Sequence, residues 1–63
     1  MASETPTPAS LLAPGNRVRN PHCLAWGIGQ VQSVDGNRVT INFENAGKQL
    51  IKTDVVDLLL IKD

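Results

Sequence analysis

The chain has 63 residues, with six basic and six acidic side chains and a formal net charge of zero. A chain of this length forms one small domain that buries only about 60% of its unfolded surface, which excludes a large enclosed ligand cavity. Balanced charge argues against attachment to nucleic acid or anionic lipid by bulk electrostatics. The 41% hydrophobic content is nevertheless enough for one compact core.

The beginning of the chain predicts a flexible tail. Residues 1–10 are rich in Ser, Thr and Pro, so little in them repays the entropy of ordering. Leu11 and Leu12 are the exception: they either form a short helical turn or dock on the folded domain, and we favour docking. We therefore place a tail at 1–13 and the folded domain at 14–63.

Neither a signal peptide nor a membrane span is evident in the sequence. The N-terminal segment has no basic region followed by an apolar run, and the longest apolar stretch, 58–61, is too short to cross a bilayer. We expect a cytoplasmic protein without membrane contact, in which the single cysteine, Cys23, stays reduced.

From residue 14 onward the pattern indicates β-structure. Residues 16–19 predict a short strand with Val18 facing inward, and Pro21 marks a loop over 20–25. A strand over 26–34 and a strand over 37–44 follow. In the second of these, apolar and polar residues alternate with a period of two, which buries one face of the strand.

The hairpin between these strands has two alternative registers. A two-residue loop at Asp35–Gly36 sets Val39 and Ile41 opposite glutamines. We predict instead a three-residue loop, 34–36, that sets Val31 opposite Val39, residue 29 opposite residue 41 and residue 27 opposite residue 43. A local bulge would rescue a two-residue loop. In the predicted register Val31, Val39, Ile41 and Phe43 line the inner wall.

Glycines and a leucine-rich end complete the expected fold. Gly27 and Gly29 on the inner face indicate a bend where a backbone or an aromatic ring comes close. A fourth strand over 48–52 precedes one helical turn over 53–56, with Thr53 or Asp54 as its N-cap, and a fifth strand over 57–62. Alternation buries two of the four apolar residues at 58–61, so the other two need a cover. We favour 11–12 over a second copy or a partner.

These elements predict an all-β fold, a small five-stranded SH3-like or Tudor-like barrel with one short helical turn before the last strand. The runs 14–19, 26–31, 39–43 and 47–50 together resemble the C-terminal Tudor domain of UvrD/PcrA-type helicases and, more distantly, the RNA-polymerase-interacting domain of CarD-type regulators. They resemble most closely the short stand-alone bacterial Tudor-like proteins of unknown function. The resemblance implies a protein-docking module of transcription or DNA repair, with RNA polymerase as the recurring partner.

The sequence holds no set of residues that indicates catalysis, and we predict no enzyme, no cofactor and no metal site. His22 and Cys23 are adjacent in an extended loop and point to opposite sides, so they do not form a nucleophile and its base. Gly27 and Gly29 lack the third glycine and the following helix of a dinucleotide site. An aromatic cage for a methylated cation needs more rings than the sequence offers.

Two binding surfaces can be derived from the charges. The first is a protein-binding patch of Trp26, Arg17, Arg19 and Lys48, because Trp and Arg are enriched where interfaces gain most of their affinity. The second is a weak nucleic-acid-binding face of Arg17, Arg19 and Arg38. Trp26 packing at the end of the barrel and charges dispersed over its exterior are the simpler interpretations of the same residues. The oligomeric state stays open between a monomer and a weak dimer.

Overall fold

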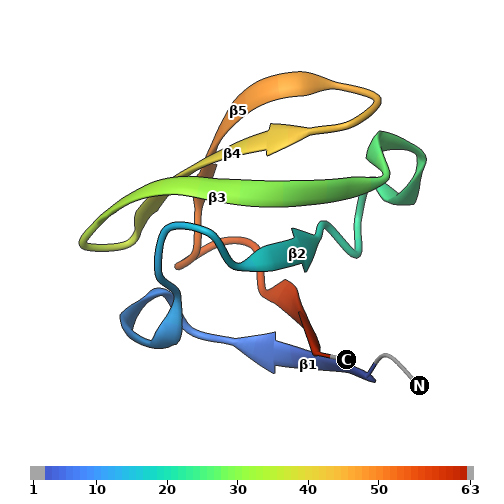
Figure 1. Cartoon of the computed structure of the whole chain (residues 1–63). Coiled ribbons are helices and arrows are strands. Elements are labelled where there is room, and N and C mark those ends of the chain that lie inside the picture. The colour runs from blue at the N-terminus through green and yellow to red at the C-terminus, as the bar shows by residue number, and fades with distance from the viewer. Residues whose placement is uncertain (1–2, 63) are drawn as a thin grey trace.

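The computed structural model describes residues 3–62 and contains one antiparallel sheet of six strands. The elements in chain order are β1 (Ser3–Thr7), the 3-10 turn η1 (Ala9–Leu11), β2 (Arg17–Arg19), the 3-10 turn η2 (Leu24–Trp26), β3 (Ile28–Asp35), β4 (Arg38–Phe43), β5 (Gly47–Lys52) and β6 (Leu58–Lys62). The order across the sheet is β1-β6-β2-β3-β4-β5. Figure 1 shows the sheet curling, with the link from β5 to β6 passing behind β3. The expected all-β, barrel-like fold class is confirmed, and the five expected strands correspond to β2–β6.

The core follows the alternation of the strands. The inner wall predicted from the sequence is confirmed, since Val31, Val39, Ile41 and Phe43 are each no more than 2% exposed. Other strands add inward side chains, and the segment before β2 closes one side. The remaining members of the core are Ala9, Leu12, Val18, Ile51 and Leu58.

The predicted register of the β3–β4 hairpin is wrong. Asp35 pairs with Arg38, so the loop has two residues, Gly36 and Asn37. Gly36 has a φ of +60° and no non-glycine residue among those described has a positive φ, which matches a turn with glycine at its first central position. The register then shifts by one residue between Val31 and Ser33, which is a β-bulge.

The observed register changes the positions of Gly29 and Gly27, which we had placed on the inner face opposite Ile41 and Phe43. Gly29 pairs with Phe43, and Gly27 precedes the strand as the residue that ends η2. A Cβ at Gly29 would lie 2.7 and 2.8 Å from two carbons of the Phe43 ring. The expected close approach of an aromatic ring therefore holds at Gly29, whereas Gly27 is needed for its φ of +76°.

The segment expected to be a flexible tail contains structure. Residues 3–7 form β1, which pairs along the whole of β6 from Ser3–Lys62 to Thr7–Leu58. This pairing uses the backbone, so a composition of Ser, Thr and Pro does not reveal it. Leu12 is buried, as docking required, but Leu11 ends a 3-10 turn and is 69% exposed. The first two residues of the predicted tail and the last residue of the predicted domain lie outside the described residues.

The last strand is preceded by a single hydrogen-bonded turn, as expected. The N–H groups of Val55 and Val56 both donate to the carbonyl of Lys52 at 3.1 Å. Thr53 does not cap this turn, because the N–H groups that it would accept from are bonded to Lys52. Its hydroxyl instead donates to the carbonyl of Asn37 at 3.1 Å. The hydroxyl and the N–H of Thr53, the latter at 2.8 Å from the same oxygen, tie the turn to the β3–β4 loop. In β6, Leu58 is buried and Leu60 packs on the core, while Leu59 and Ile61 are partly exposed.

Candidate interaction face

The Lys and Arg residues of β2, β4 and β5 gather on the outward side of the sheet. In β2 and β4 the buried residues alternate with polar or charged ones, and in β5 the buried Ile51 lies between Leu50 and Lys52, so the cations and the core residues point to opposite faces. We call the outward side of β2–β5 the cationic face. Its cations are Arg17, Arg19, Arg38, Lys48 and Lys52, which are all the Lys and Arg residues between positions 7 and 61.

The pairing of the strands places these cations in rows across the face. Arg17 aligns with Gln30, Gln30 with Asn42, and Asn42 with Lys48. Arg17 and Lys48 therefore end one row, about 14 Å apart across three strand spacings. Arg19 belongs to the next row and pairs with Ile28.

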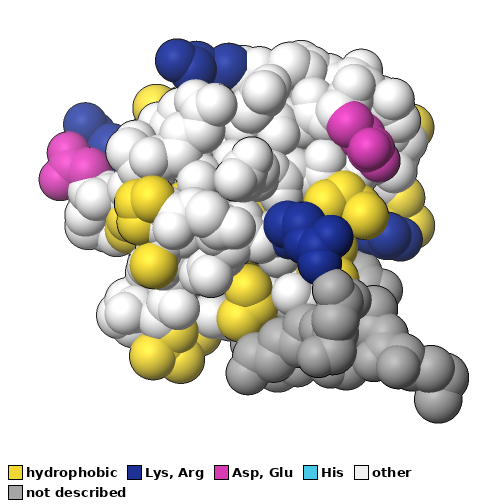
Figure 2. Space-filling view, in the orientation of Figure 1, with side chains coloured by type: hydrophobic (Ala, Val, Ile, Leu, Met, Phe, Trp, Pro, Cys, Tyr) yellow, Lys and Arg dark blue, Asp and Glu magenta, His cyan; other side chains and the backbone are white. Residues whose placement is uncertain are grey.

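A shallow groove of about 310 Å³ runs along this row. It is lined by Arg17, Ile28, Gly29, Gln30, Asn42 and Glu44. Ile28 is partly exposed, so an apolar floor lies between cationic and acidic side chains. Figure 2 shows Lys and Arg side chains on both sides of an apolar patch, with an acidic side chain nearby.

Glu44, the carboxylate in this groove, has a structural partner. Its Oε1 accepts a hydrogen bond from the N–H of Ile28 at 3.0 Å, and its own N–H donates to the carbonyl of Ile28 at 3.0 Å. A Cβ at Gly27 would lie 2.6 Å from Cγ of Glu44. The bare backbone at Gly27 thus lets Glu44 fold against β3, and part of its acceptor capacity is used there.

Trp26 lies away from this groove. Its ring packs edge-on against Phe43, with the centroids 5.1 Å apart and the planes at 62°. Phe43 points inward, so Trp26 closes an end of the core and is only partly exposed. The structure therefore brings Arg17, Arg19 and Lys48 to one face, but it places the Trp26 ring against the inner side of β4.

The other half of the cationic face was only partly anticipated. Arg38 pairs with Lys52 on β5 and with Asp35 on β3, so a carboxylate adjoins this pair of cations. Leu50 is 57% exposed between the two lysines of β5. Sequence reasoning missed Ile28, Leu50 and Lys52 as surface residues of this face, although alternation along β5 places Leu50 and Lys52 beside Lys48.

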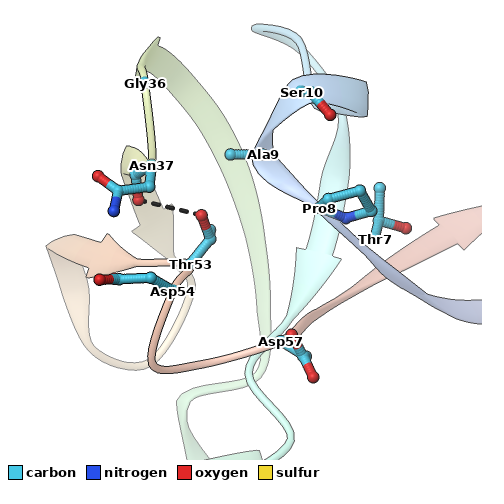
Figure 3. Close-up of a pocket in the computed structure, with 9 residues that line it drawn as sticks. All are labelled: Thr7, Pro8, Ala9, Ser10, Gly36, Asn37, Thr53, Asp54 and Asp57. Carbon is cyan, nitrogen blue, oxygen red and sulfur yellow. Dashed lines mark hydrogen bonds between the residues drawn. The ribbon is translucent and has the colours of Figure 1, made fainter.

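A second cavity, of about 430 Å³, lies between the N-terminal segment and the link that precedes β6 (Figure 3). Its lining residues are Thr7, Pro8, Ala9, Ser10, Gly36, Asn37, Thr53, Asp54 and Asp57. Asp54 and Asp57 stand on separate parts of its rim and are exposed. The lining of this cavity includes two carboxylates and no Lys or Arg, in contrast to the cationic face.

The loop residues considered for chemistry are not assembled into a site. His22 is exposed, and its backbone N–H donates to the side-chain oxygen of Asn20 at 2.9 Å. Cys23 is partly exposed. Across the described residues, no three His, Cys, Asp or Glu side chains lie close enough to hold a metal ion. Within the same part of the chain, none of the helical segments has the length and hydropathy of a membrane span.

Fold and surface define a small all-β domain that presents a charged sheet face with a shallow, partly apolar groove. The chain belongs to the family described as protein of unknown function (DUF3553), whose model matches residues 12–61. This match covers β2–β5 and all of β6 but its last residue, whereas β1 and η1 precede it. No curated protein and no solved structure matches the chain.

Proposed function

We propose that this domain is a non-catalytic protein-interaction module that docks through its cationic face on an acidic surface of a transcription or repair protein. The observation that carries the proposal is the excess of positive charge on one face. Its five Lys and Arg residues outnumber its two carboxylates, Asp35 and Glu44, whereas Asp54 and Asp57 line the second cavity. A formal charge of zero therefore coexists with a local positive field, which steers an acidic partner.

The position of the aromatic rings favours a protein partner over single-stranded nucleic acid. Stacking of bases needs aromatic rings on the binding face. Phe43 is 2% exposed and Trp26 packs against it. Binding of a phosphate backbone by Arg17, Arg19 and Arg38 is the second candidate, because all three belong to the same outward face.

RNA polymerase is the first partner to test, because the resemblance to helicase and CarD-type Tudor domains implies it. The finer kinship within Tudor-like domains and the cytoplasmic location belong to the same proposal. The Tudor-like kinship is supported by the all-β fold, and the shallow groove suits a flat protein contact better than a small molecule.

The test is direct binding of the purified domain to purified bacterial RNA polymerase by interferometry over a range of salt concentrations. We expect binding that weakens as salt rises, and at least about a tenfold loss for the double variant Arg17→Glu, Lys48→Glu. The control is Asp54→Asn, Asp57→Asn, which alters two charged residues off the face and should bind at least as tightly as the parent does.

The outcomes separate the candidates. No binding to polymerase, or equal losses in both double variants, contradicts the proposal. Anisotropy of labelled duplex and single-stranded DNA forms the second arm. Salt-dependent DNA binding that is lost in Arg17→Glu, Arg38→Glu, without any polymerase binding, would replace a protein partner by nucleic acid.

A further inference from the structure

We propose that the outer edge of β5 receives an extended acidic segment of the partner as an added strand. This inference rests on the proposed function and specifies how the partner is held. The segment carries an acidic residue, an apolar residue and an acidic residue at alternate positions. The two acidic residues face Lys48 and Lys52, and the apolar one faces Leu50.

The edge is open because β5 is the last strand of the sheet. The bond from the N–H of Thr53 to the carbonyl of Asn37 sets the phase of the β4–β5 ladder. In an antiparallel pair, alternate residues turn their N–H and carbonyl groups toward the neighbouring strand. Gln49 and Ile51 therefore bond to β4, while the backbone groups of residues 48, 50 and 52 point to the open side.

The groups that remain for a partner can be specified. The carbonyl of Lys52 is occupied, because it accepts from Val55 and Val56. This leaves the N–H groups of residues 48, 50 and 52 and the carbonyls of residues 48 and 50. Within the described residues, none of these N–H groups donates a backbone hydrogen bond. Their spacing of about 6.8 Å matches the repeat of an extended chain.

The side chains along this edge select the added strand. Lys48, Leu50 and Lys52 are exposed on the outward face, and Leu50 is 57% exposed. Opposite charges in directly paired positions attract and like charges repel. A strand with carboxylates opposite the lysines and an apolar side chain opposite Leu50 complements all three, and its backbone supplies the bonds of β-augmentation.

A second copy of this chain is a poor occupant of the edge. Antiparallel pairing of two β5 strands about Leu50 would set Lys48 of each copy against Lys52 of the other. The opposite edge of the sheet is less suitable as well, since β1 includes Pro6, which has no N–H to donate. For these two reasons we assign β5 as the binding edge and an acidic segment of a different protein as its occupant.

The experiment uses the whole domain and a blocked seven-residue peptide in which Glu, Val and Glu occupy alternate positions and Thr occupies the remaining ones. Amide chemical shifts and hydrogen exchange are followed by NMR during titration. We expect the amides of residues 48, 50 and 52 to shift and exchange at least about tenfold more slowly with bound peptide, whereas Gln49 and Ile51 change little. This alternation is specific to an added strand, because general charge attraction would not produce it.

Two peptide controls and one variant complete the test. N-methylation at Val removes an N–H that faces β5 and should abolish the shifts, whereas N-methylation at a flanking Thr should not. Replacing Glu by Lys in the peptide should abolish binding, and Lys48→Glu, Lys52→Glu in the protein should restore it for the Lys peptide.

Failure of this inference differs from failure of the proposed function. Uniform shifts across the cationic face, or equal effects of the two methylated peptides, would overturn edge binding while polymerase binding by the same protein still stood. The same alternation without peptide, with a doubled mass in sedimentation, would show a second copy on β5 and overturn the inference. Loss of all polymerase binding would instead overturn the proposed function.

Discussion

The replacement Gly29→Ala tests the packing of the core most directly. The added Cβ would lie 2.7 and 2.8 Å from two carbons of the Phe43 ring and closer still to Cγ2 of Ile41. Both neighbours are fully buried, so neither has open space to move into. Gly29 has no positive φ, and without a clash alanine would stabilise the domain by about 0.4–1 kcal/mol. Overpacking costs about 1–3 kcal/mol. A loss of stability in Gly29→Ala therefore indicates the clash, and a gain indicates its absence.

We expect Gly29→Ala to lower the free energy of unfolding by about 1–3 kcal/mol. In a domain of this size each kcal/mol shifts the melting temperature by about 4–8 °C. Urea unfolding followed by the fluorescence of Trp26, the single tryptophan, and melting followed by circular dichroism both measure it. Gly36→Ala is the control, because nothing lies within 4 Å of its Cβ and any loss there reports only its φ of +60°.

A double variant separates the clash from a general loss of strand stability. Phe43→Leu removes the ring carbons that a new Cβ would meet, at the cost of a cavity. Gly29→Ala should therefore cost less in the Phe43→Leu background than in the parent. Strictly additive losses would assign the clash to Cγ2 of Ile41 alone. A Gly29→Ala protein as stable as the parent would refute the packing argument.

Three further changes test other parts of the fold. Trp26→Ala should lower the unfolding free energy by about 2–4 kcal/mol in urea titrations followed by circular dichroism, because the ring closes the core; wild-type stability would place it outside the core. Thr53→Val should cost about 0.5–1.5 kcal/mol by the same method, since it removes the bond to Asn37, whereas Thr53→Ser should cost less. Deletion of residues 1–8 should leave the domain folded but raise its mass in light scattering, because the edge of β6 becomes open; a monomer at every concentration would contradict this.

Alternation was the part of the sequence that predicted the structure well. In β4 each apolar residue has a polar neighbour on both sides, so a single assignment buries Val39, Ile41 and Phe43 together. The cations of β2 and β5 follow from the same rule, because residues two apart share a face. Half of the candidate face could therefore be placed before any coordinates were known.

The pairing of β1 and the position of the Trp26 ring could not be predicted from alternation. β1 is held by main-chain pairing with β6, which a pattern of side chains does not reveal. Trp26 belongs to a 3-10 turn that ends in a glycine with a φ of +76°, so it leaves the alternation of β3 and turns toward Phe43. Its assignment to the same patch as the arginines assumed that it was part of the strand.

The bulge at Gln32 explains why the hairpin register was misjudged. Val31 and Val34 both pair with inward residues of β4, although they are three positions apart. An odd spacing requires an extra residue, and Gln32 and Ser33 are both exposed. Because both of these adjacent residues are polar, the alternation of the sequence does not show which of them is the extra one. The bulge thus keeps both valines inside and lets Asp35 reach its pair, Arg38.

If Gln32 is the extra residue of the bulge, its deletion should be far better tolerated than deletion of another residue from the same strand. It would bring Val31 and Val34 into simple alternation and join the two halves of the ladder, so we expect an unfolding free energy within about 1 kcal/mol of the parent. Deletion of Gln30 is the matched control: one residue is lost on the other side of Val31, where the ladder is already regular. Residues 28 and 29 would then change faces, and the loss should be several-fold larger than that from deletion of Gln32. Urea titrations of both variants decide the matter, and equal losses would show that Gln32 is an ordinary member of the ladder.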